Sequence, residues 1–429
     1  MLRDSLVANA EWQGDRVDDF FDEQPGKMIH QARWGPLSAL RLDAFSRYYG
    51  DWATPLDFLV GLGQYLMWTG DRDTVRDLLP AARRVLDWID VYGDPDGDGF
   101  LEYRTRSPVG VEHQGWKDSF DAIVDAKGNI FNPPIASSEI QGYWFAGLQQ
   151  VSQAFLACGD PAFAGRLLLS ASNLRRRFER TFWMPHERFY ALALGRGGRV
   201  ADSISSNAGH LLACGIVSLE RARDVTRRLL EPEMFSGWGI RTLSRDNPYY
   251  NPFSYHRGSV WPVEQGTIAF GLARYGFWDE LHTLARGVFD LTDLFFANRL
   301  PEVVAGNPRD EQHPHPGIYP YSCEPQGWSA SAIVLLVQAL LGLRPIAPLG
   351  LLVVDPHLPE WLPDLRLEGV HVAGSRLDIA FERRRNGRTS YHVTATDGRV
   401  RVLRAPVPNA NPGLLRRVGD FALSFGAYI

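Results

Sequence analysis

The sequence has little cysteine and no long hydrophobic run. Its 429 residues include only Cys158, Cys214 and Cys323, an odd number at wide spacings that suits neither a disulfide framework nor a zinc site. Nowhere do eighteen apolar residues follow one another, and the N-terminus has no apolar stretch typical of a signal peptide. We therefore expect reduced cysteines, no membrane span and a cytoplasmic protein.

A basic excess is also missing. Lys plus Arg number 45 against 50 Asp plus Glu, a net charge of -5, which argues against a nucleic-acid partner. No histidine pair has zinc spacing, and neither a metal nor a cofactor is expected. Aromatic residues are abundant, with 13 Trp, 15 Tyr and 23 Phe. Such an excess indicates either a sugar-binding cleft or a large core, and composition does not separate the two.

Hydrophobic periodicity predicts consecutive helix pairs over the first three-quarters of the chain. The expected helices are 2–10, 54–69, 72–92, 137–158, 160–182, 204–215, 218–230, 262–275, 277–297 and 327–342. The connections 93–136, 231–261 and 298–326 are long, and loops of this length are usually functional. Paired helices with elaborated loops predict an (α/α) toroid or a helical solenoid. The absence of a fixed-period repeat argues against a simple solenoid.

The pattern changes after Pro345. Segments 350–384 and 388–404 alternate apolar and polar residues in short runs broken by Pro and Gly, which is typical of strands. We predict a mainly α fold with two domains: a helical domain over 1–344 and a small antiparallel β module over 345–429.

An acidic turn follows the helix at 72–92. The segment DPDGDGFLEYR begins at Asp94 and ends beyond Glu102, and it resembles the start of an EF-hand loop. Its twelfth position is Thr105 instead of the bidentate Glu that calcium needs. A structural turn and a bound cation both remain open for this segment.

Two acidic residues lie in long predicted loops, beside residues that could change the ionisation or burial of their carboxyl groups. Asp118 follows Trp116 and Lys117; an indole would disfavour the ionised carboxylate, while the lysine would favour it. Glu302 follows a proline among apolar residues after a predicted helix. A surface Asp and a structural buried Glu are the plain alternatives. Glycoside hydrolysis needs such a pair, one acid for the leaving oxygen and one base or nucleophile opposite it.

Eight ordered motifs resemble the bacterial glycogen-debranching-like, amylo-α-1,6-glucosidase family. They are DEQPGKMIHQARWG, YYGDWATPL, HQGWKDSFD, PIASSEIQGYWFAGL, GWGIRTL, YNPFSYHRGSVWP, RLPEVVAG and CEPQGWSASAIVLLVQALLGL, collinear from about residue 20 to 345. The resemblance implies an (α/α)6 barrel that cleaves α-linked glucose with inversion. It makes Asp118 the general acid and Glu302 the general base, which an inverting enzyme holds ~6.5–9.5 Å apart.

The resemblance also implies a sugar pocket of aromatic and polar residues around the acids, for an oligosaccharide or glucoside substrate. Its candidates are Tyr49, Trp52, Glu102, Trp116, Lys117, Trp238, Arg241, Tyr255, His256, Trp261, Gln326 and Trp328. Core packing is the competing account for each of them.

The chain departs from the family at its start. The usual N-terminal β-rich domain and the first helix pair, with the Asp that holds the terminal glucose, have no counterpart here. We expect a barrel one helix pair short, which a partner chain or a second copy would complete because the gap exposes apolar surface. A truncated gene or a repurposed protein is the alternative. A non-catalytic glycan-binding relative and a trehalase-like or glycosyl-glycerate hydrolase are the rival functions.

Overall fold

The computed structural model describes residues 1–406, and these divide into two compact units. Unit 1 comprises 1–65, 72–204 and 247–249; unit 2 comprises 66–71, 205–246 and the chain from 250 onward. The predicted domain boundary between 344 and 345 stays a prediction. The part of the expected β module at 407–429 lies outside the described residues.

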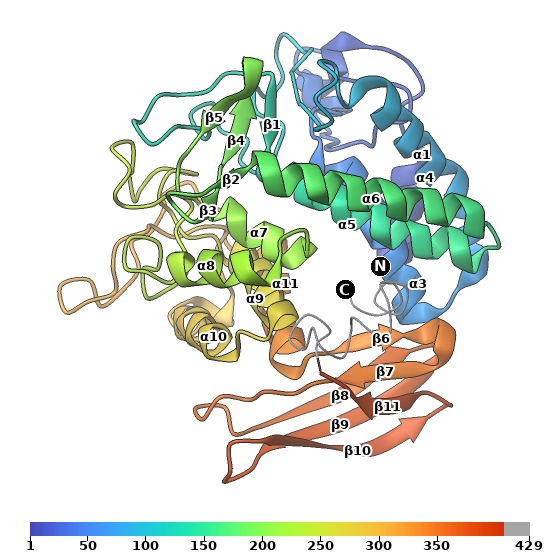
Figure 1. Cartoon of the computed structure of the whole chain (residues 1–429), viewed down its shortest axis with the longest axis vertical. Coiled ribbons are helices and arrows are strands. Elements are labelled where there is room, and N and C mark those ends of the chain that lie inside the picture. The colour runs from blue at the N-terminus through green and yellow to red at the C-terminus, as the bar shows by residue number, and fades with distance from the viewer. Residues whose placement is uncertain (407–429) are drawn as a thin grey trace. The chain divides into compact units, whose positions relative to one another are not determined.

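Unit 1 is built mainly from helices (Figure 1). They are α1 (Leu2–Glu11), α2 (Pro36–Ala39), α3 (Ala53–Thr69, whose last turn belongs to unit 2), α4 (Arg72–Tyr92), α5 (Ser138–Ala157) and α6 (Pro161–Thr181). Short strands join them: β1 (Ile135–Ser137), β2 (Trp183–Met184), β3 (Phe189–Tyr190), β4 (Ala193–Gly195) and β5 (Arg199–Ala201). The strands β1, β4 and β5 form one antiparallel sheet, and β2 pairs with β3.

Unit 2 combines helices with the C-terminal strands. Its helices are α7 (Asn207–Cys214), α8 (Leu219–Leu229), α9 (Pro262–Tyr275), α10 (Trp278–Thr292) and α11 (Gly327–Leu341). Its strands are β6 (Arg344–Ile346), β7 (Leu351–Val354), β8 (Asp364–Val372), β9 (Ser375–Arg383), β10 (Thr389–Asp397) and β11 (Arg401–Arg404).

All ten expected helices are present, with ends shifted by a few residues. The largest difference is at α10, which ends at Thr292 and not near 297. Farther along this segment, Ala297 and Asn298 adopt left-handed φ angles of 53° and 55°, which an α-helix does not contain. The strands β1 to β5 were not predicted, because two- and three-residue strands carry too short a pattern to recognise.

Burial distinguishes two kinds of helix in each unit. Every residue of α5 and α9 is buried or half-buried, whereas α6 and α10 bury only one stripe. In unit 1, α5 packs against α6, and in unit 2, α9 packs against α7, α10 and α11. A helix that buries all its faces belongs to the interior, so each unit has an inner and an outer helix layer.

The strands after α11 form a module with its own hydrophobic core. β8, β9 and β10 are consecutive antiparallel strands, drawn in orange and red (Figure 1). A second sheet has the order β11-β7-β6, in which β11 runs parallel to β7, unlike the purely antiparallel module that the sequence predicts. Leu352, Val354, Ile379 and Phe381 are among the residues buried in this core.

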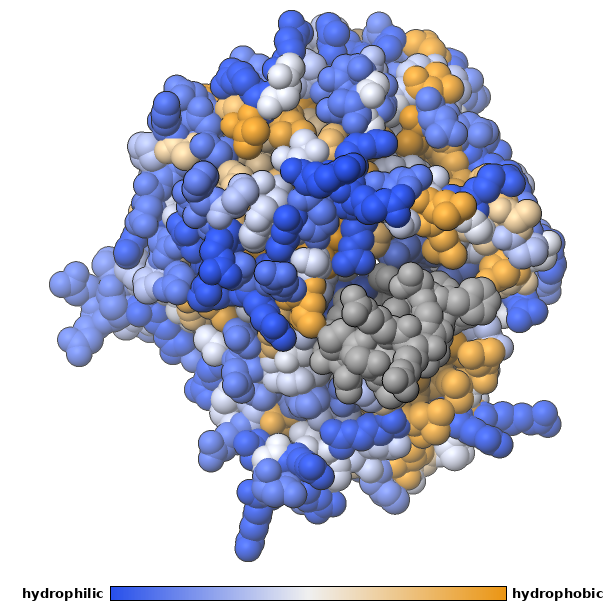
Figure 2. Space-filling model, in the orientation of Figure 1, coloured by the Kyte–Doolittle hydropathy of each residue, from blue (hydrophilic) through white to orange (hydrophobic). Residues whose placement is uncertain are grey.

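The surface matches the ordinary composition of the sequence. Hydrophilic side chains predominate on the face shown in Figure 2, and hydrophobic side chains form small separate patches. Within residues 1–406, every helix is too short or too polar to cross a lipid bilayer.

Candidate active site

Glu302 lies in the loop after α10, where its carboxylate is buried and held by three donors. Its Oε1 accepts hydrogen bonds from the Tyr255 hydroxyl at 2.8 Å and from the Gln326 amide at 3.5 Å. Its Oε2 accepts the backbone N–H of Cys323 at 3.3 Å. The Glu302 backbone N–H in turn donates to the Cys323 carbonyl at 2.9 Å. The side chain is 8% exposed, so this acid is buried.

Aromatic rings surround the hydroxyl that binds Glu302. The Tyr255 ring lies 4.5 Å from His256, 4.6 Å from Trp261 and 5.6 Å from Tyr319. Trp261 also contacts Trp328 edge-on at 5.5 Å, and Trp328 is 42% exposed. The structure therefore brings five of the predicted pocket residues together with Glu302.

Two further predicted pocket residues hold the neighbouring loops. Arg241 is fully buried and donates to the carbonyl oxygens of Gly306 at 2.6 Å and Pro232 at 3.0 Å. Burial lowers the pKa of the Arg241 guanidinium. Trp238 is also buried and lies under the Arg309 guanidinium at 4.3 Å. These contacts favour the packing alternative for Arg241 and Trp238.

Asp118 lies in the connection between α4 and β1, and it is exposed. Of the two interpretations of Asp118 from sequence, a surface Asp and an Asp packed against Trp116, its exposure favours the surface Asp. Lys117 takes the buried position instead, with its ammonium 5.4 Å from the Trp116 ring. A lysine can bury its aliphatic stem and place its charge over an indole, which an aspartate cannot do.

A group of charged residues in unit 1 was not predicted. The His30 Nδ1 lies 3.2 Å from Asp51, whose carboxylate also accepts the backbone N–H groups of Ala53 and Thr54 at the start of α3. Burial alone would lower the pKa of His30, but the Asp51 charge and hydrogen bond outweigh it and raise the pKa. The charge of Asp118 adds a smaller contribution in the same direction, so it lies within electrostatic range of His30.

Lys27 is a buried cation beside that group. Its ammonium lies 5.8 Å from the Trp52 ring and 5.7 Å from the Trp88 ring. Burial lowers the pKa of Lys27 to about 8, although the charges of Asp22 and Asp51 oppose this shift. Lys27 and His30 both belong to the DEQPGKMIH motif, but spacing alone assigns them no role.

The remaining predicted pocket residues of unit 1 are buried. The Tyr49 hydroxyl donates to the Trp12 carbonyl at 2.8 Å and accepts from Arg47 at 2.6 Å, so protein groups satisfy it. Trp52 packs against Trp88 at 4.8 Å. Burial, followed by the charges of the preceding aspartates, raises the pKa of Glu102 to about 7. Sugar contact by these residues stays a prediction.

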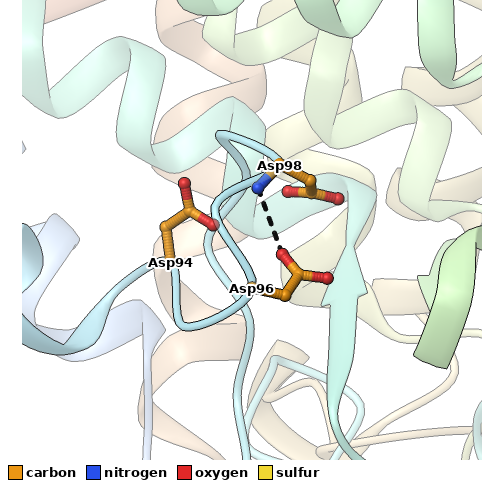
Figure 3. Close-up of side chains that lie close together, drawn as sticks. All are labelled: Asp94, Asp96 and Asp98. Atoms are coloured by element: carbon orange, nitrogen blue, oxygen red, sulfur yellow. Dashed lines mark hydrogen bonds between the residues drawn. The ribbon is translucent and has the colours of Figure 1, made fainter.

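The acidic turn brings Asp94, Asp96 and Asp98 within reach of one another (Figure 3). The Asp94 carboxylate accepts the backbone N–H groups of Gly97 and Gly99, each at 2.8 Å. Asp96 accepts the Asp98 N–H at 3.2 Å. Thr105, the twelfth position, donates to Asp22 at 3.2 Å. Backbone groups of the turn thus occupy its carboxylates, which favours the structural interpretation.

Three solved structures share this fold. They are a sialidase (TM-score 0.62, 14% identity, 82% of this chain and 32% of that chain), a GH78 family rhamnosidase of Bacillus sp. GL1 (0.59, 14%, 85% and 34%), and a GH63 mannosylglycerate hydrolase from Thermus thermophilus (0.54, 15%, 78% and 87%). The chain spans about a third of the length of the first two. No curated protein matches the chain significantly.

Sequence identities of 14 and 15% show a shared fold, and a match to a family model shows the family. The model of the mannosylglycerate hydrolase MGH1-like glycoside hydrolase domain matches residues 62–302, more than half of the chain. The solved structures confirm the predicted fold class, mainly α with a C-terminal β module, and the predicted enzyme class of glycoside hydrolase is confirmed by the family. The chain belongs to the mannosylglycerate hydrolase MGH1-like glycoside hydrolase family.

Proposed function

We propose that this protein hydrolyses the glycosidic bond of a small glycosyl conjugate, with glycosyl-glycerates as its first candidate substrates. The family match over residues 62–302 carries the proposal. It is supported by the mannosylglycerate hydrolase from Thermus thermophilus, of which the chain covers 87%. Structures of that enzyme bound to glucose and to D-glycerate share the same fold with this chain.

Glu302 is the proposed general base and Asp118 the proposed general acid. In a single displacement, Glu302 takes a proton from water while the water oxygen bonds to the anomeric carbon. The bond to the leaving oxygen breaks, and Asp118 protonates that oxygen, so the anomeric configuration inverts. A buried carboxylate held by three donors suits the base. Asp118 is proposed as the acid because of its place in the HQGWKDSFD motif, and its exposure leaves it accessible to a substrate oxygen.

Release of a terminal α-linked glucose from a branched glucan is the second candidate. The eight ordered motifs that resemble the glycogen-debranching-like family favour it. The two candidates differ in the leaving group, which is a small acid in the first and a glucan chain in the second.

The test is sugar release by the purified chain from α-mannosyl- and α-glucosyl-glycerate, an α-1,6-linked glucan oligosaccharide and trehalose. Preferred turnover of a glycosyl-glycerate, with the opposite anomeric configuration in the first-formed product by NMR, is expected. Preferred turnover of the α-1,6 glucan would establish the second candidate. Oligosaccharide affinity without any turnover would replace both with a glycan-binding function.

A further inference from the structure

The donors that hold the two oxygens of Glu302 differ in strength and origin. The shortest bond is the 2.8 Å bond from the Tyr255 hydroxyl to Oε1. The Gln326 amide is farther from the same oxygen, at 3.5 Å, and the Gln326 side-chain oxygen is already used by the Gly327 N–H at the start of α11. Oε2 has a backbone donor at 3.3 Å. Tyr255 is therefore the side chain that determines how the Glu302 carboxylate is turned.

The backbone and ring of Tyr255 are held in place by residues next to the start of α9. The Tyr255 carbonyl accepts hydrogen bonds from the Trp261 indole at 2.8 Å and from the Ser259 hydroxyl at 2.6 Å. Trp261 is 1% exposed and is the residue immediately before α9. Its ring also packs against the Tyr255 ring at 4.6 Å. A buried helix start thus sets the position of the hydroxyl before any substrate binds.

We propose that Tyr255 is a positioning residue that orients the Glu302 carboxylate for the removal of a proton from water. This inference rests on the proposed role of Glu302 as the base. A hydroxyl that donates to a carboxylate restricts rotation of the group.

The test compares Tyr255→Phe with Tyr250→Phe. Both variants lose one hydroxyl that donates to residues 302–306, because the Tyr250 hydroxyl binds the Gly306 carbonyl at 3.0 Å. Tyr255→Phe should lower kcat by about 10- to 100-fold with little change in KM. Tyr250→Phe should keep the wild-type kcat and KM. Thermal unfolding of both variants reports on the fold.

An unchanged kcat in Tyr255→Phe, or a change confined to KM, would overturn the positioning role. An equal loss of kcat in Tyr250→Phe would also overturn it, because loosening of the loop would then explain both losses. Loss of the proposed function is a separate outcome: turnover that persists in Glu302→Gln removes Glu302 as the base, whatever the Tyr255 variant shows.

Discussion

The two units attach their long loops to an inner helix in the same way. In unit 1, the Gln141 amide of α5 pairs with both the N–H and the carbonyl of Leu101, each at 2.9 Å. In unit 2, the Gln265 amide of α9 pairs with the N–H and the carbonyl of Ile240, at 2.7 and 3.1 Å. Both glutamines precede a glycine near the start of their helix. A side-chain amide can replace a strand partner because it carries both a donor group and an acceptor, like the backbone of a strand.

The two units differ in how they hold their acids. Glu302 is buried with donors on both oxygens, whereas Asp118 is exposed on its loop. The same method of loop attachment thus supports a carboxylate that is oriented before substrate arrives and another that is left accessible. This difference suits a base that must be aimed at one water and an acid that must approach a leaving group.

The largest effect is expected at the buried acid. Glu302→Gln keeps the shape of the side chain but cannot accept a proton, so hydrolysis of every substrate should fall by about 10²–10⁴-fold. Initial rates of sugar release measure this. A variant that hydrolyses the preferred substrate at the wild-type rate would make Glu302 a structural acid.

The exposed acid should be sensitive to the leaving group. Asp118→Asn should slow substrates with poor leaving groups by about 10²-fold or more and should leave glycosyl fluorides much less affected, because fluoride departs without a proton. The ratio of the two rates, measured for wild type and variant, checks the assignment. Equal losses on both substrates would contradict it.

The hydrogen bonds by which Gln141 and Gln265 hold the long loops should stabilise both units. Gln265→Ala leaves the buried N–H and carbonyl of Ile240 without their partner, and Gln141→Ala does the same to Leu101, so each should lower the free energy of unfolding by about 2–3 kcal/mol. Gln338 makes one bond of 3.3 Å to the Leu343 carbonyl and is the matched control, with an expected loss of ~1 kcal/mol or less. Urea unfolding compares the three variants. A loss of stability in only one of the variants Gln265→Ala and Gln141→Ala would mean that the two units do not share this way of holding a loop.

The smallest effect concerns Glu102, which follows the acidic turn. Burial, with the charges of Asp96, Asp98 and Asp94, raises the pKa of Glu102 from 4.5 to about 7. The folded state keeps a proton that the unfolded state releases, so stability falls as pH rises between these values. Glu102→Gln should be more stable than the wild type by about 1 kcal/mol at pH 8 and equal to it at pH 4.

Thermal unfolding at the two pH values measures that difference. The exposed Glu360 supplies the control, since Glu360→Gln should differ from the wild type in stability by the same amount at both pH values. A gain for Glu102→Gln that is independent of pH would show that proton binding is not its cause.

Much of the helical architecture could be predicted from hydrophobic spacing. The stripe Ala164, Leu167, Ala171, Leu174 and Phe178 on α6 follows the helical period closely, and the expected and observed helices agree. The five short strands of unit 1 could not be predicted because two- and three-residue strands carry too short a pattern. The parallel pairing of β11 with β7 could not be predicted because it depends on a partner far away in the sequence. Five of the candidate pocket residues lie together with Glu302, and Asp118 takes the exposed position that was one of its two interpretations from sequence.

The sequence by itself determined the helix pairs, the β module, the candidate acids and the glycosidase class, since these depend on residue type, local period and motif order. Tertiary structure alone decided the environment of each candidate. It made Glu302 buried and hydrogen-bonded, Asp118 exposed, and Arg241 a loop anchor. The physical reason is that burial and hydrogen bonding come from neighbours brought in from other segments. Tyr255 and Cys323, for example, stand 47 and 21 residues from Glu302 in the chain.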